Sequence, residues 1–303
     1  MEWWNPGLSI GGLVAGLMVG LTGMGGAALV TPMLVLLFGV NPAAAVSTDL
    51  VASAVMKPIG SLVHIRERTV HWGLVMWLSI GSVPGVLVGT WIFAKYASAS
   101  ADTIKTWIGA VLIIALVAMV ARTFVAARAS RLAGGRELLG IQAPVRIWPT
   151  VILGLGVGLV VGTTSVGSGS LVVTCLLLLY PLLRPSVLVG TDLTQAVPML
   201  IAGALAHMTL GAVDWAVAAS LLIGQIPGVW LGSRMSSRYD GHALKWLLMV
   251  VLLATAIKML GAPSLLAAGI AIGGVAVVIV LIVVEYVGKR RKADEQELDR
   301  AVA

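Results

Sequence analysis

The amino-acid sequence predicts an all-α polytopic membrane protein with two inverted repeats, broken or re-entrant helices, and one further transmembrane helix near the C-terminus. Three observations predict this class. Of 303 residues, 59% are hydrophobic and 11% are charged, whereas a soluble domain has about 25% charged residues. Apolar runs close to the roughly 20 residues needed to cross a bilayer recur along the chain. The third observation is an internal repeat.

The repeat relates residues 1–125 to residues 147–262 at nearly one offset. Gly16–Thr22 returns 142 residues later, as Gly158–Thr164, and four further matches follow at an offset of 143 residues. These pair Thr48-Asp49-Leu50 with Thr191-Asp192-Leu193, His64 with His207, Val70-His71-Trp72 with Val213-Asp214-Trp215, and Pro84-Gly85 with Pro227-Gly228. Duplicated halves are typical of transporters.

Apolar runs and helix breakers place the individual helices. In the first repeat we expect helices near 7–21, 27–40, 42–63, 71–95 and 103–124. In the second repeat we expect them near 147–162, 170–181, 186–207, 213–234 and 242–260, followed by a final span at 264–287. The first two segments of each half are short for full spans, which indicates re-entrant or discontinuous helices.

Two polar, glycine-containing breaks separate these short segments, one at residues 22–26 and one at residues 163–170. Irregular backbone at membrane depth is tolerated where it lines a cavity, and paired breaks in duplicated halves indicate a substrate site. The alternative is close helix packing through small residues. The candidate substrate-binding residues of the breaks are Thr22, Gly23, Gly25, Gly26, Thr164, Ser165 and Ser168.

The third helix of each half carries the polar residues most unusual for a membrane span. Charged groups inside a span are costly and usually face a cavity or a partner. Lys57 has no counterpart in the second half, where Leu200 takes its place. One unmatched cation favours a single anion site, although Lys57 could instead extend toward the helix end. The further candidate ligands on these two helices are Thr48, Ser53, Thr191 and Gln195.

Asp49 and Asp192 follow Thr48 and Thr191 near the starts of the same helices. They are candidates for proton coupling, and helix capping is the alternative. His64 and His207 are candidates for gating, because histidine changes its charge near neutral pH, with a structural role as the alternative. In the fourth helices, Pro-Gly pairs flanked by further glycines predict tight packing with a bend.

The distribution of basic residues predicts the orientation. Arginines crowd the 126–146 linker, and Lys289–Lys292 follow the last span, so both are expected in the cytoplasm. The protein is then expected in the cell inner (plasma) membrane, with its N-terminus on the outer side. Each half crosses an odd number of times, which makes the two halves inverted. Residues 263–303 form the C-terminal helix and a basic cytoplasmic tail.

These motifs resemble the TauE/SafE family of sulfite and organosulfonate exporters over about residues 7–260. The resemblance rests on the duplicated break, the Thr-Asp pair and the Pro-Gly pair. Gly23, Gly25 and Gly26 match the family's first glycine loop, and Thr48 matches its threonine. The second loop departs from this pattern, with Ser165 and Ser168 at the positions of Gly23 and Gly26.

The resemblance implies a secondary transporter, an exporter by alternating access, for anions such as sulfite, sulfoacetate or other organosulfonates. The alternatives are import of a sulfur compound, transport of another small anion, and an intramembrane enzyme or a structural partner protein. The sequence contains no recognisable catalytic pair, metal-binding cluster or cofactor motif. We therefore expect that the protein is not an enzyme and that it binds no metal or cofactor. The expected partners are a small anion and the lipid bilayer but no nucleic acid, and a homodimer is left open.

Overall fold

The computed structural model describes residues 4–22, 27–97, 101–132, 140–141, 143–167, 169–211, 213–236 and 242–276. Within these ranges the chain is helical, without strands. The helices are α1 (Pro6–Thr22), α2 (Ala27–Leu36), α3 (Pro42–Arg66), α4 (Trp72–Ala97), α5 (Ala101–Leu132), α6 (Ile147–Thr164), α7 (Ser170–Leu179), α8 (Pro185–Thr209), α9 (Trp215–Ser236) and α10 (His242–Met259). One more helix covers Ser264–Ala276.

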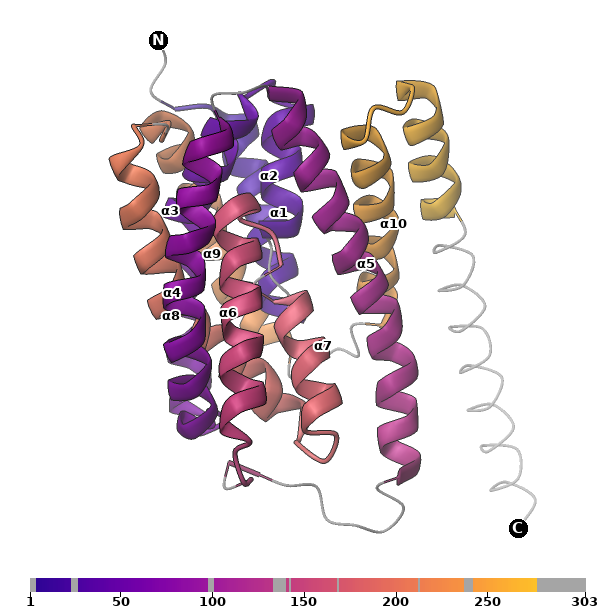
Figure 1. The fold of residues 1–303 in the computed structure, drawn as a ribbon. Coiled ribbons are helices and arrows are strands. Elements are labelled where there is room, and N and C mark those ends of the chain that lie inside the picture. Colours follow the sequence, from indigo (N-terminus) through magenta and orange to yellow (C-terminus); the bar gives the residue numbers. More distant parts are fainter. Residues whose placement is uncertain are drawn as a thin grey trace, which may run out of the picture.

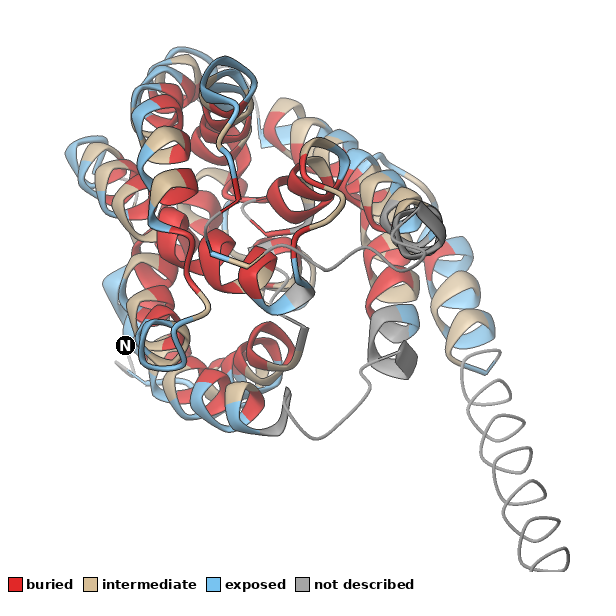
Figure 2. Ribbon diagram, turned by 90° about the horizontal axis from the view of Figure 1, so that it is seen from below, coloured by how far each residue is buried: buried red, intermediate tan, exposed pale blue. Residues whose placement is uncertain are grey.

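Six of these helices are long and apolar enough to cross a membrane, counting only the described residues. They run together lengthwise as one bundle (Figure 1), and buried residues face its interior (Figure 2). The chain is therefore a multi-pass α-helical membrane protein. The six candidate spans are Pro42–Arg66, Trp72–Tyr96, Ala101–Ala121, Ile147–Thr164, Ser186–Thr209 and Trp215–Arg234.

Two helix boundaries differ from the prediction by more than three residues. α2 ends at Leu36 rather than at residue 40, because Gly39 takes a left-handed φ of 64° and Asn41 starts α3 by accepting the N–H of Ala43 at 2.9 Å. α5 continues to Leu132, into the segment predicted as a linker. Its last turns are rich in Ala and Arg, which favour helix without requiring a membrane.

The first two helices of each half lie antiparallel to each other. In α1, Gly7 and Gly11 lie against Phe38 and Met33, which are close to the end of α2. The hydroxyl of Tyr180, just after α7, accepts the N–H of Arg146 at 2.8 Å, just before α6. A helix of 10 residues such as α7 rises about 15 Å, half of the hydrocarbon core. Each pair thus starts and ends at the same end of the bundle, as a re-entrant pair would.

Glycines hold four helices in direct backbone contact. α1 packs along α9, and α4 packs along α6. A side-chain carbon added at any of these glycines would collide with the backbone of the partner helix, and the glycines recur every four residues, on one face of each helix. This confirms the predicted packing role of the Pro-Gly segments. The glycines are Gly12, Gly16 and Gly20 in α1, Gly81, Gly85 and Gly89 in α4, Gly154, Gly158 and Gly162 in α6, and Gly224, Gly228 and Gly232 in α9.

The third helices of the two halves, α3 and α8, pack against each other in the interior. They are antiparallel, because Ser61 near the end of α3 donates to Thr194 near the start of α8 at 3.0 Å. At the other end, Ser47 of α3 meets His207 of α8 at 2.9 Å. The polar residues predicted on these helices therefore lie along the interface between the two halves.

Candidate functional site

Asp49 is the centre of a buried polar cluster that joins the two halves. Its side chain is 0% exposed. Thr31 of α2 and Ser165 donate to its Oδ2 at 2.7 and 2.9 Å. Ser53, one turn further along α3, donates to Oδ1 at 3.3 Å. Asp49 and Ser165, which were predicted separately for proton coupling and for substrate binding, are thus in direct contact, and Thr31 joins them although the sequence did not single it out.

Ser165 ends α6 in a left-handed conformation, with φ of 61°. Glycine usually takes this position, because a side chain there costs roughly 1–2 kcal/mol. The corresponding position of the first half is Gly23. The serine at this position brings its hydroxyl to Asp49. Before it, the hydroxyl of Thr164 donates to the carbonyl of Val160 at 2.8 Å and accepts the N–H of Val166 at 3.2 Å, which shapes the break itself.

Lys57 lies inside the bundle, not at a helix end. The residue is 1% exposed, so its ammonium does not extend toward the helix end as the alternative interpretation required. The carboxylates of Asp192, from the other half, and of Asp49 both attract its charge. A buried cation is tolerated only with such partners. When all three groups are ionised, this set carries one excess negative charge.

Thr48 and Thr191 each hold the start of a helix in the opposite half. The hydroxyl of Thr48 accepts the N–H of Asp214, just before α9, at 3.0 Å. The hydroxyl of Thr191 accepts the N–H of His71, just before α4, at 3.1 Å. Both threonines are fully buried. The structure gives them a capping contact, and their role as substrate ligands remains a prediction.

The two predicted gating histidines have different surroundings. His207 is buried and connects three helices: its Nδ1 meets Ser47 Oγ at 2.9 Å, and its Nε2 donates to the carbonyl of Gly162 at 3.0 Å. His64 lies near the opposite end of the α3–α8 pair, and its ring forms a hydrogen bond with its local neighbour Thr69 at 3.0 Å. Of the two, His207 is the one next to the end of α6.

Replacing His207 with Ala should lower the free energy of unfolding by about 2–3 kcal/mol, because the buried Ser47 hydroxyl and Gly162 carbonyl lose their partner. His64→Ala is the matched control and should change stability by less than about 1 kcal/mol, since its contact is local and partly exposed. Denaturant unfolding of both purified variants checks this. Equal losses would show that His207 does not hold the α6 end.

Two buried glutamines have side-chain amide atoms without hydrogen-bond partners among the described residues. Gln195 Oε1 accepts a weak hydrogen bond from Ser82 at 3.4 Å, while its Nε2 has none in the described part of the chain. Neither amide atom of Gln225 on α9 has a partner there. Both residues are 1% exposed. Buried amides without hydrogen bonds are rare in native proteins and need an explanation.

Gln225 is the functional candidate that the sequence analysis missed. Its helix packs on α3, and Val229, one turn later, contacts Met56, the neighbour of Lys57. A signal was present in the sequence: Gln225 matches Ser82 at the repeat offset of 143 residues, and both are polar residues inside an apolar helix. Gln195 was predicted, but its neighbour Ser82 was not.

Several predicted substrate ligands cannot be placed. Gly23, Gly25, Gly26 and Ser168 lie outside the described residues, as does the side chain of Thr22. The structure therefore brings together the predicted residues of α3, α8 and the α6 end, and it leaves the first glycine loop as a prediction.

Proteins with similar sequences are described as probable membrane transporter proteins. Residues 8–259 match the family described as Sulfite exporter TauE/SafE. The probable membrane transporter protein YjnA of Bacillus subtilis (strain 168) is 35% identical over 253 residues, which cover 82% of this chain and 97% of YjnA. The probable membrane transporter protein YunE of the same organism is 27% identical over 243 residues, 75% of this chain and 85% of YunE. A probable membrane transporter protein of Xylella fastidiosa (strain 9a5c) is 28% identical over 254 residues, 82% of this chain and 92% of that protein. No solved structure matches the chain.

Proposed function

Because this membrane transporter belongs to the TauE/SafE sulfite exporter family, we propose that it exports small sulfur-containing anions, such as sulfite, sulfoacetate or other organosulfonates. The observation that supports this most strongly is Lys57, a buried cation between carboxylates of both halves. Neutral amide donors accompany it in the same membrane interior. The proposed membrane is the cell inner membrane, with the N-terminus outside and the C-terminus in the cytoplasm.

We infer that the halves are inverted repeats that exchange conformations in alternating access. The helix contacts support this inference because they are reciprocal: α1 packs on α9 as α6 packs on α4, and α3 on α9 as α8 on α4. The capping contacts of Thr48 and Thr191 are reciprocal in the same way. Such a scaffold can take two states, related by a pseudo-two-fold rotation, around a fixed site.

The proposed anion site lies between α3, α8 and α9. A sulfonate or sulfite offers several acceptor oxygens and needs donors that replace its hydration. Lys57 supplies a charged donor, and the amides of Gln195 and Gln225 supply neutral ones. Leu200 in place of a second lysine makes the proposed site single and asymmetric.

Charge balance suggests how transport is coupled to protons. The ionised set of Lys57, Asp49 and Asp192 already has one excess negative charge, and a bound anion would add a second. Uncompensated charge is costly in a membrane interior. In our proposal the anion displaces Asp192 from Lys57, and Asp192 takes up a proton. Asp49 keeps its hydrogen bonds from Thr31 and Ser165 and holds the end of α6.

A binding panel tests this function. Purified protein is titrated with sulfite, a taurine-like sulfonate, a sulfocarboxylate, thiosulfate and a simple carboxylate, and then the panel is repeated with Lys57→Ala. We expect saturable binding of at least one sulfur oxyanion and its loss in the variant. Binding of carboxylate but of no sulfur oxyanion would replace the proposed substrate class. Binding unchanged by Lys57→Ala would remove Lys57 from the site.

Gln225→Met should separate binding from folding. We expect unchanged or higher stability, by up to about 2 kcal/mol, because the variant removes a buried amide without hydrogen bonds. Anion affinity should fall roughly tenfold, as expected for one lost hydrogen bond to a charged group. Ser79→Ala, which also removes a buried polar atom without a partner among the described residues, is the control and should leave affinity unchanged. Lower stability together with unchanged affinity would exclude Gln225 from the site.

A further inference from the structure

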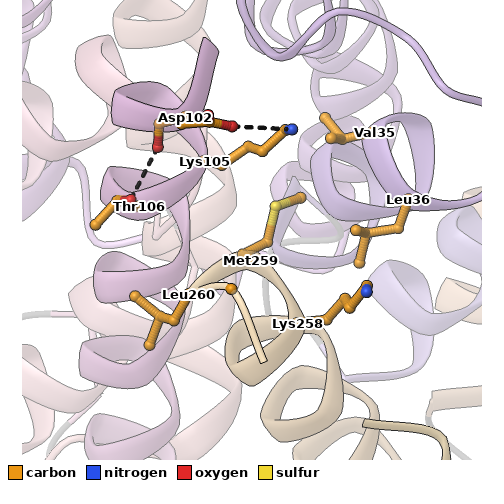
Figure 3. A pocket seen from close by; sticks show the side chains of 9 residues that line it. Val35, Leu36, Asp102, Lys105, Thr106, Lys258, Met259 and Leu260 are labelled. Carbon is orange, nitrogen blue, oxygen red and sulfur yellow. Dashed lines mark hydrogen bonds and ion pairs between the residues drawn. The ribbon is translucent and has the colours of Figure 1, made fainter. Parts of the chain in front are cut away.

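A pocket lined by two lysines opens between α2, α5 and α10, away from the proposed transport site. Its volume is about 340 Å³. Figure 3 shows Lys105 reaching from α5 toward α2, and Lys258 on the α10 side of the same pocket. Asp102 pairs with Lys105 at 3.3 Å, but its side chain is 90% exposed, so this pair is weak. The two lysines therefore outnumber the one solvent-exposed carboxylate, that of Asp102, and the pocket has an excess positive charge that favours binding of an anion.

An apolar groove of about 400 Å³ lies next to this pocket, and Leu36 lines both. The groove is formed by α1, α2, α10 and Ala271 of the last helix. Its one hydroxyl group belongs to Thr255, which donates to the carbonyls of Val251 and Leu252 at 2.8 and 3.0 Å and so adds no free donor. The groove suits a hydrocarbon chain.

One face of α10 connects the two cavities. Val251, Ala254 and Thr255 line the groove, and Lys258 lines the pocket. Spacings of three and four residues place them on one side of the helix, and the rise from residue 251 to residue 258 is about 10 Å. A ligand that fills both cavities must have an anionic head and an apolar tail.

We propose that this composite site binds one anionic phospholipid, with its phosphate between Lys105 and Lys258 and an acyl chain in the groove. Phosphate oxygens accept from ammonium groups, and the surrounding bilayer supplies the lipid. The helix Ser264–Ala276 helps to build the site, since Ala271 lines the groove and Ser264 accepts from Lys258 at 2.7 Å. Among the described residues, the first half has no counterpart of that helix, so we propose one such site.

The test uses the purified full chain in detergent with phosphatidylglycerol, phosphatidylcholine or inorganic phosphate. Native mass spectrometry measures lipid retention, and thermal unfolding measures stabilisation. We expect phosphatidylglycerol to be retained in preference to phosphatidylcholine and to raise Tm, and phosphate alone to do neither. The double variant Lys105→Ala/Lys258→Ala should lower phosphatidylglycerol retention by about tenfold or more.

Two further variants make the test specific. Lys95→Ala is the control, because Lys95 stacks on Trp91 at 4.8 Å and lies outside the pocket; retention should not change. Val14→Trp fills the groove from a position that is 54% exposed, so we expect the variant to fold and to lose retention of phosphatidylglycerol. Four results would each overturn the proposal. The first two are equal retention of the two lipids and stabilisation by phosphate alone. The others are a loss of retention in Lys95→Ala as large as in the double lysine variant, and full retention by Val14→Trp.

Discussion

Lys57→Leu is expected to abolish anion transport and to lower the free energy of unfolding by about 3–5 kcal/mol, the range for breaking a buried ion pair. Position 57 corresponds to Leu200 in the second half, so the variant makes the two halves alike at this position. It leaves the buried Asp192 without the charge of Lys57 and removes the proposed ligand of the substrate. Transport is measured in proteoliposomes and stability by denaturant unfolding.

The double variant Lys57→Leu/Asp192→Asn separates the two effects. Removing both charges takes away the uncompensated carboxylate, so most of the lost stability should return. Transport should not return, because the cation is still missing. A double variant that is stable and transports like the wild type would show that Lys57 serves folding alone.

Gly158→Ala is expected to lower the free energy of unfolding by about 2–3 kcal/mol, as for an overpacked core. Its new methyl group would meet the backbone of Ser82 and Val86 across the α4–α6 contact. Gly156→Ala, two residues away in the same helix, has nothing within 4 Å of the added carbon. That control should leave stability unchanged or raise it by up to about 1 kcal/mol, because alanine favours helix over glycine.

Thermal unfolding in one detergent compares the two variants directly. A similar Tm for both would mean that α4 and α6 are not in backbone contact at Gly158. The same pair of measurements can be repeated with Gly228→Ala in α9, which meets α1 in the same way.

The sequence predicted the helices closely because their signals are local. Apolar runs mark the spans, and prolines and glycines mark their ends, so most predicted ranges agree with the structure to within a few residues. The end of α5 was misplaced because arginines mark where a span leaves the membrane and not where a helix stops. The prediction for α2 overlooked the left-handed Gly39 and the cap at Asn41.

The candidate site could be predicted in part. Lys57, Asp49 and Asp192 stand out because charges are rare in apolar spans. Thr31 does not stand out, because a hydroxyl is common in membrane helices, and the contact between Asp49 and the predicted Ser165 could not be foreseen because the two residues lie on different elements. The capping contacts of Thr48 and Thr191 depend on tertiary packing between the halves, which one sequence does not specify.

Flux of sulfur oxyanions into or out of proteoliposomes tests the central claim most directly. The account predicts saturable flux of sulfite or an organosulfonate by the wild-type protein, and none by the folded variant Lys57→Leu/Asp192→Asn. Absence of flux for every sulfur oxyanion with folded wild-type protein, or wild-type flux in that variant, would contradict it.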